Sequence, residues 1–145
     1  MQQLKMNILN MLRNLGKFNF QLYNKYYRSQ AIYYLEKQKL EKCIEALSKI
    51  NDYAKAAYDG ILLARTNLVL ANMYISGRIY CGESADYQAA KHYFRIFKNI
   101  NEKHFNDKMT IHGYKKLSQC YQYMKDYDSA IKCCKKILTI AYVSK

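Results

Sequence analysis

The sequence predicts an all-α fold built from stacked helix pairs. The 145 residues include no proline and only five glycines, and helix interiors exclude proline at a cost of about 3 kcal/mol. Half of the residues are hydrophobic and 24% are charged, which is enough to build a core and excludes a disordered tail. Apolar residues also recur at helical spacing in three similar segments of the chain. We therefore expect one helical domain rather than a β-sandwich or barrel with many tight turns.

The same pattern of residues along one side of a helix recurs in three segments of the chain. Each has a large residue, a small residue three positions later and a core-sized residue four positions after that. The small residues are Cys43, Ala90 and Ala130. A second helix lies upstream of each segment and is marked by a small residue followed, three positions later, by a tyrosine: Ala31 and Tyr34, Ala71 and Tyr74, Ser118 and Tyr121. Apart from one insertion, the spacing predicts helix pairs with a period of 40 residues.

The middle pair carries seven extra residues in its turn. Its tyrosine precedes its small residue by sixteen positions, against nine positions in the other two pairs. We place the insertion at 76–83, which contains two of the five glycines and has the composition of a loop. Its Arg78, Tyr80 and Cys81 belong either to a contact loop or to a tolerated extension.

The same patterns predict the element boundaries. An amphipathic helix over 5–15 belongs to an N-terminal segment, 1–23, and the repeats follow over 24–145, divided into 24–58, 61–105 and 108–145. Helices are expected over 24–35, 39–55, 61–75, 86–102, 108–124 and 126–143, with helix caps at Asp59, Ser84, Asn106 and Asp126. The acid-free N-terminal segment has some likeness to a mitochondrial presequence, but it has few Arg and Ser residues, and packing on the next helix is the simpler interpretation.

The third segment resembles the tetratricopeptide repeat, through Tyr121, Asp126, Tyr127, Ala130 and Ile137. This resemblance implies a tetratricopeptide-like α-solenoid of about three helix-turn-helix repeats, stacked into a right-handed superhelix. The 40-residue spacing is similar to the longer variety found in spindle-orientation regulators with Leu-Gly-Asn repeats and in some axonemal proteins. The chain departs from the motif at Asn67, which stands in an aromatic slot, and at Gln30, which stands in a leucine slot; no repeat has the proline that often ends the motif.

The resemblance also implies a binding groove lined by the first helix of each pair. The matching positions that we select as partner-binding residues are Lys25, Arg28, Arg65, Asn72, His112, Lys115, Lys116 and Gln119. Lys and Arg are frequent among them, so the groove should suit an acidic ligand. The clamp that some family members use for chaperone tails is not matched, because Ile32 and Val69 stand where it needs asparagines.

The net charge of +13 points to an acidic partner. Residues 91–145 hold twelve basic and four acidic residues, so most of the net positive charge lies in the last 55 residues of the chain. No stretch approaches the roughly 18 apolar residues that cross a bilayer. We expect a protein-interaction or scaffold module that docks an acidic protein segment, with tubulin as one candidate, in the cytoplasm and in a ciliary or cytoskeletal setting. The alternative is an RNA-contacting helical repeat protein in an organellar, mitochondrial complex.

The sequence indicates no catalytic, cofactor or metal site. Its three histidines have no ligand spacing, and no phosphate-binding or hydrolase motif occurs. Five cysteines without a CxxC pair favour a reducing compartment. By alignment Cys134 takes the core position and Cys133 is half exposed. The recurrent Tyr34, Tyr74 and Tyr121 are expected in the core, and their outward neighbours are candidates for contact surfaces.

Overall fold

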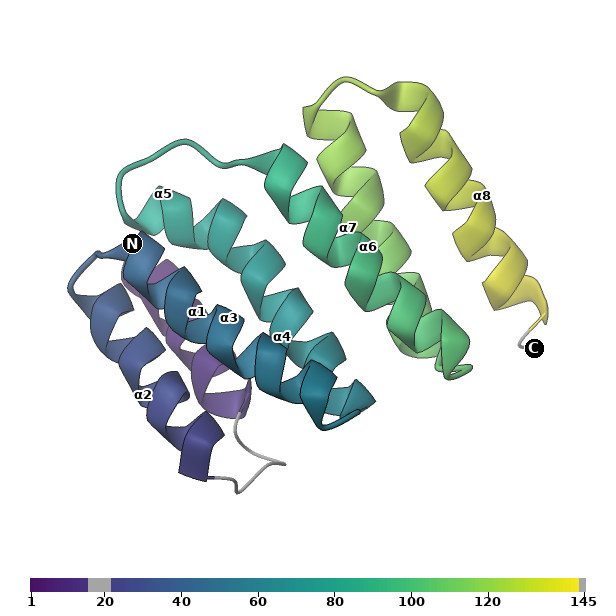
Figure 1. Ribbon diagram of the computed structural model, residues 1–145. Helices are drawn as coiled ribbons and strands as arrows, with labels where there is room; N and C mark the ends of the chain where they lie inside the picture. The colour runs from purple at the N-terminus through teal and green to yellow at the C-terminus, as the bar shows by residue number, and fades with distance from the viewer. Residues whose placement is uncertain (16–21, 144–145) are drawn as a thin grey trace.

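The computed structural model describes residues 1–15 and 22–143, and this part of the chain contains helices and no strands (Figure 1). The elements are α1 (Gln2–Leu15), α2 (Leu22–Glu36), α3 (Leu40–Ala56), α4 (Gly60–Asn72), the π-helical turn η1 (Met73–Gly77), α5 (Arg78–Tyr80), α6 (Tyr87–Lys103), α7 (Asp107–Tyr123) and α8 (Tyr127–Val143). The predicted all-α class is confirmed. Each long helix begins and ends within three residues of its predicted boundaries.

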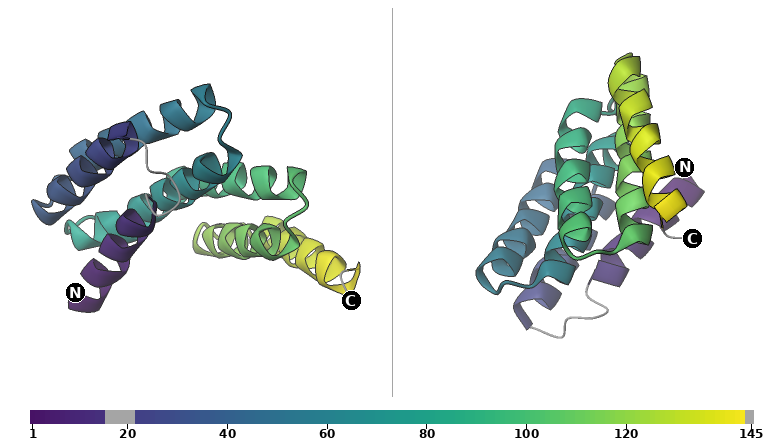
Figure 2. Two further views of the ribbon diagram at one scale, coloured as in Figure 1. Left: turned by 90° about the horizontal axis from the view of Figure 1, so that it is seen from below. Right: turned by 90° about the vertical axis from the view of Figure 1, so that its right-hand side faces the viewer.

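The helices from α2 to α8 pack in chain order, each against the next, with the short α5 continuing the line of α4 and η1 (Figure 1). The helix α1 departs from this order, because it packs against α2, α4 and η1. In the left view of Figure 2, α1 runs below α4 and α7 runs below α6. The N-terminal helix therefore lies on the side of the array toward which α7 is displaced.

The turns between helices repeat one backbone motif. A residue after the helix end adopts a left-handed conformation with φ between 53° and 61°, as at Gln38, Tyr58, Phe105 and Lys125. The residue that follows donates its N–H to a carbonyl five positions earlier, which satisfies an otherwise unpaired helix-end carbonyl. These turns make consecutive helices antiparallel without proline or glycine.

The same hydrogen bond confirms the insertion. The carbonyl of the recurrent tyrosine accepts a bond of 2.8 Å from the N–H of the residue just before the second helix: Lys39 to Tyr34, Asp86 to Tyr74 and Asp126 to Tyr121. The donor lies five positions after the tyrosine in two pairs and twelve positions after it in the middle pair. Seven extra residues are therefore accommodated between two ends that keep their repeat geometry.

The expectation that the insertion is a loop is wrong for its first half. Met73–Gly77 forms a π-helical turn and Arg78–Tyr80 continues as a helix, so α4 is prolonged. Gly77 is buried, and a Cβ atom there would lie 3.0 Å from Leu40 Cδ1. This glycine permits close packing on α3 rather than a bend. Arg78 closes the loop that follows, through a 2.6 Å bond from Nε to the carbonyl of Ser84 and a 3.2 Å ion pair with Glu83.

Three of the four predicted helix caps are confirmed. Asp59 accepts a hydrogen bond from the N–H of Leu62, and Asn106 and Asp126 make the corresponding bonds to the third residue after them. Ser84 is not a cap, because Asp86 takes this role for α6 through a 3.0 Å bond from the N–H of Ala89. Asp86 is the residue that the tyrosine carbonyl bond holds at the start of α6, so its side chain is the one in position.

Two apolar clusters hold the array together. The first joins α1, α2, α3, α4 and η1, and the second joins α4 and the three later long helices. Tyr34, Tyr74 and Tyr121 are half-buried at the edges of these clusters rather than inside them. A lysine ammonium lies 5.4 Å from the ring centroid of Tyr34 and of Tyr121, which accounts for rings that stay at the surface.

The prediction for the burial of the two adjacent cysteines of α8 is wrong. Cys133 is buried in the second cluster and Cys134 is exposed. The residues at the position of Cys134 in the earlier pairs are Leu47 and Phe94, and both are buried because another helix follows them. Since α8 packs mainly against α7, Cys134 keeps a contact to that helix, with 3.6 Å between its Sγ and Ser118 Oγ, and is otherwise exposed.

Candidate functional site

The predicted groove is filled by the chain itself along α2 and α4. Ile8, Leu9, Leu12 and Leu15 form the apolar face of α1, and all four side chains are buried. They belong to the cluster that contains Val69 and, at its edge, Ile32, two residues at the predicted groove positions. The guanidinium of Arg28 donates a 2.9 Å hydrogen bond to the carbonyl of Arg13 at the end of α1. The face of α2 and α4 that was expected to bind a partner therefore binds an amphipathic helix in cis.

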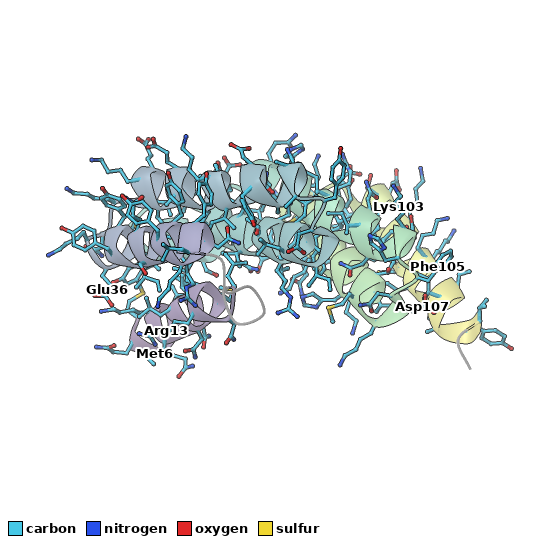
Figure 3. All side chains as sticks on the ribbon, turned by 60° about the horizontal axis from the view of Figure 1, so that its bottom comes forward. Met6, Arg13, Glu36, Lys103, Phe105 and Asp107 are labelled. Atoms are coloured by element: carbon cyan, nitrogen blue, oxygen red, sulfur yellow. The ribbon has the colours of Figure 1, made fainter. Side chains whose placement is uncertain are left out.

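Helix α1 does not extend to the turn between α6 and α7. In Figure 3, Met6 and Arg13 mark α1 on one part of the array, whereas Phe105 and Asp107 mark the α6–α7 turn well away from it. Next to that turn, α4, α6 and α7 enclose an open cleft of about 650 Å³. We call this the α4–α7 cleft; its lining residues are Gly60, Ile61, Ala64, Arg65, Leu68, Phe97, Ile100, Asn101, His104, Asn106 and Met109.

The wall of the α4–α7 cleft is mainly apolar. Phe97 is buried, whereas Leu68 and Met109 are half-buried and Ile61 is largely exposed. Asn101 and Asn106 use their side chains within the chain, through bonds to the carbonyl of Phe97 and from the N–H of Met109. Arg65 and His104 are the basic side chains of the lining. This arrangement suits apolar side chains of a ligand that carries negative charge beside them.

Among the eight predicted site residues, Arg65 lines the cleft. His112 lies next to the cleft, because its imidazole ring packs edge to face against the ring of the lining residue Phe97, with the ring centroids 6.0 Å apart. Burial, with Lys116 and Lys115 nearby, lowers the pKa of His112 from its usual 6.5, so the imidazole is neutral at pH 7. The positive charge of this part of α7 therefore comes from the lysines.

The remaining predicted residues lie elsewhere on the array. Lys115 and Gln119 are exposed on α7, and Lys116 is half-buried there. Lys25 is exposed on α2, and Asn72 donates to the carbonyl of Leu68 in its own helix. Of the predicted residues, Arg65 thus lies in the cleft and His112 lies next to it through Phe97.

The prediction did not include most of the apolar lining of the cleft. Ile61, Ala64 and Leu68 are spaced at i, i+3 and i+7, and they continue toward Ala71, which packs in the second cluster. This stripe was visible as helical periodicity. The sequence did not show that one end of this stripe is uncovered, because that depends on the relative positions of α4, α6 and α7.

The described residues provide no reactive thiol pair or metal cluster. Burial raises the pKa of Cys43 to about 12 and of Cys120 to about 11, and it also raises the pKa of Cys81 and Cys133. These four groups are neutral thiols at pH 7 and therefore weak nucleophiles. No group of three or more His, Cys, Asp or Glu side chains in the described ranges has the geometry to hold a metal ion.

None of the helices in residues 1–15 and 22–143 has the length and apolar character needed to span a bilayer. Comparisons with protein-family models, with curated proteins and with solved structures found no match to this chain.

Proposed function

We propose that this chain is a non-catalytic interaction module that binds an acidic, amphipathic segment of another protein in the α4–α7 cleft. The observation that carries the proposal is an open cleft of about 650 Å³ with an apolar wall and Arg65 in its lining. The adjoining part of the array, along α2 and α4, is closed by α1. Helix α1 is an internal example of the class of ligand that such a surface accepts, a short helix with one apolar face.

Charge favours an acidic ligand over a neutral one. Residues 91–145 contain twelve basic and four acidic residues. One of the acids, Glu102, is engaged within the chain by Lys98 at 3.8 Å and by the hydroxyl of Tyr114 at 3.1 Å. An acidic segment entering the cleft would therefore meet net positive potential, which raises its association rate and selects against basic segments.

Within this proposal the repeats form a tetratricopeptide-like α-solenoid. The assignment is supported by helix packing in chain order, by the repeated left-handed turns and by the tyrosine carbonyl bond that recurs in all three pairs. The same proposal places the protein in the cytoplasm as a scaffold of a ciliary or cytoskeletal assembly. Tubulin is a candidate partner because its surface is acidic.

A binding measurement with three probes tests the proposal. Fluorescence anisotropy would compare a labelled glutamate-rich amphipathic peptide, purified tubulin and a single-stranded RNA of matched charge. The Arg65→Glu variant should weaken peptide binding about tenfold, because it reverses a charge at the cleft. Lys25→Glu, which makes the same charge change on α2, should leave the affinity within about twofold.

The apolar wall is tested separately. Ile61→Asp should also weaken peptide binding, and Ile61 is exposed enough for the fold to survive. The matched control is Ile79→Asp on α5, at the opposite end of the prolonged α4 helix (Figure 1). RNA that displaces the peptide and binds Arg65→Glu as well as the wild type would show that the protein-docking proposal is wrong and would favour the RNA-contacting alternative.

A further inference from the structure

The outer face of α8, on the side away from α7, is uncovered. Phe94 and Phe97 on α6 are buried in the helix–helix interface with α7, which we call the α6–α7 joint. Leu47 and Ile50 are buried in the corresponding interface between α3 and α4, the α3–α4 joint. On α8 the matching positions hold Cys134, which is exposed, and Ile137, which is half-buried. In Figure 1, α8 forms the edge of the array.

This face is more apolar than the equivalent faces inside the array. Ile131, Leu138 and Tyr142 are 54%, 69% and 82% exposed. These three residues lie at i, i+7 and i+11 on one side of the helix. Cys134, at i+3, borders this stripe, and its thiol also contacts Ser118 of α7 at 3.6 Å. The corresponding residues of α6 are Lys91, Lys98 and Glu102. A helix side that faces only water normally carries polar residues, so contiguous exposed apolar residues on this side indicate an interaction surface.

The two internal joints show what such a face binds. At the α3–α4 joint, Asn67 Nδ2 donates to Asn51 Oδ1 at 3.0 Å. At the α6–α7 joint, the ammonium of Lys98 lies 4.9 Å from the centroid of the Tyr114 ring. Each contact joins residues sixteen positions apart, at equivalent repeat positions, so both joints have the same register. In both, the occupant is an antiparallel helix.

We propose that the outer face of α8 is a third joint of this kind, and that it docks an antiparallel amphipathic helix of a partner protein with an acidic residue at its rim. The charge of α8 selects the acidic partner. Lys132, Lys135 and Lys136 are exposed, and Asp128 is the one acid of the helix. Lys135 holds the position of Arg95, whose Nη2 atom donates a 2.7 Å bond across the α6–α7 joint to the hydroxyl of Tyr121. An acidic side chain at the matching place in the partner would accept from Lys135.

A second copy of the chain is a poorer occupant on grounds of charge. Head-to-tail stacking would place α2 on α8, and the first 35 residues contain no acid. The basic residues near that end would then face the lysines of α8, in a protein whose net charge is already +13. The α8 joint is also independent of the α4–α7 cleft, because the two surfaces share no residue.

Titration of the full chain with a designed helical peptide tests this joint. The probe is the sequence of α7 with its three lysines and the residue at the place of Tyr121 changed to glutamate, and a scrambled peptide of the same composition is the control. The wild type should bind the probe and not the scrambled peptide. Leu138→Lys should weaken binding at least tenfold, while Thr139→Lys, which adds the same charge beside the stripe, should change it by less than about threefold. Lys135→Glu should weaken binding of the acidic probe and restore binding of the unmodified, basic α7 peptide.

Helix content and melting temperature of each variant would be compared with the wild type, and exposure of Leu138 leads us to expect no change. Equal affinities of Leu138→Lys and Thr139→Lys, or no binding of the probe, would overturn the proposal. Sedimentation that shows self-association of the wild type, lost in Leu138→Lys, would also overturn it by showing that a second copy occupies the face. Loss of binding in Arg65→Glu but not in Leu138→Lys would place the probe in the cleft instead.

Discussion

Replacing Gly113 by alanine should destabilise the protein, although the same change in most helices is stabilising. Gly113 lies within α7 and is buried against α6. A Cβ atom at this position would lie 2.7 Å from Lys98 Cβ and 3.0 Å from Lys98 Cα. Carbon atoms in ordinary contact are about 3.5–4.0 Å apart, so the two helices would have to separate by roughly 1 Å. The second contact is with backbone, which cannot rotate away.

The magnitude follows from two opposing terms. Alanine is favoured over glycine in a helix interior by about 1 kcal/mol. Overpacking of a well-packed joint costs about 1–3 kcal/mol, and we take about 2–3 kcal/mol here because one of the clashing atoms, Lys98 Cα, is backbone. Separation of α6 from α7 would also loosen Phe94 and Leu117, which are buried in the same cluster. We expect a net loss of about 1–2 kcal/mol, which corresponds to a fall in melting temperature of about 3–8 °C for a chain of this size.

Urea unfolding followed by circular dichroism measures this change. Gly60→Ala is the matched control, because a Cβ atom there meets only the Nε2 end of the His104 side chain at 3.1 Å, and that side chain can move. The control should be neutral or slightly stabilising. If Gly113→Ala is as stable as the wild type or more stable, the close approach of α6 and α7 is refuted.

Three further predictions concern stability. Tyr58→Gly should stabilise the fold by about 0.5–1 kcal/mol in a thermal melt, because a residue that is 95% exposed and has a φ of 53° loses no contact and escapes left-handed strain; a lower melting temperature would contradict this. Leu12→Ala should cost about 2–4 kcal/mol in urea, since the side chain is fully buried, whereas the exposed Met6→Ala should cost little. The folded pKa of His112 lies below its unfolded value of 6.5, so unfolding takes up a proton and the free energy of unfolding of the wild type falls as the pH drops below 6.5. His112→Gln should therefore show a smaller loss of stability between pH 7 and 5.5. An unchanged pH profile would count against this.

The parts of the fold that the sequence predicted are those governed by local physics. Helix boundaries followed from apolar periodicity, and caps such as Asp59 and Asn106 followed from side chains that satisfy the first N–H groups of a helix. The seven-residue insertion was counted correctly because the repeat fixes both of its ends. Its conformation was not predicted. Gly77 has loop composition, but it serves as a close contact within a prolonged helix.

The parts that the sequence did not predict depend on which surfaces meet. Alignment assigned Cys134 to the core on the assumption that every second helix is covered by a following one, and α8 breaks that assumption. The predicted groove residues lie on helices, but the guanidinium of Arg28 is engaged by the carbonyl of Arg13 in α1. The amphipathic pattern of α1 showed that it would bury one face. It did not show that the face would lie against both α2 and α4.

The position of α1 decides where a partner can bind. Were α1 packed away from α2 and α4, the predicted groove along these two helices would be open to an extended ligand, and the guanidinium of Arg28 would be available to it. With α1 against α2, α4 and η1, such a ligand would have to displace four buried apolar side chains. Burial of one such side chain is worth about 1.5–3 kcal/mol before ordering costs, so displacement competes with a substantial stabilisation. A partner of the kind we propose would therefore bind the surfaces that α1 leaves uncovered, the α4–α7 cleft and the outer face of α8. Helix α8 and the α6–α7 side of the cleft belong to the more basic part of the chain.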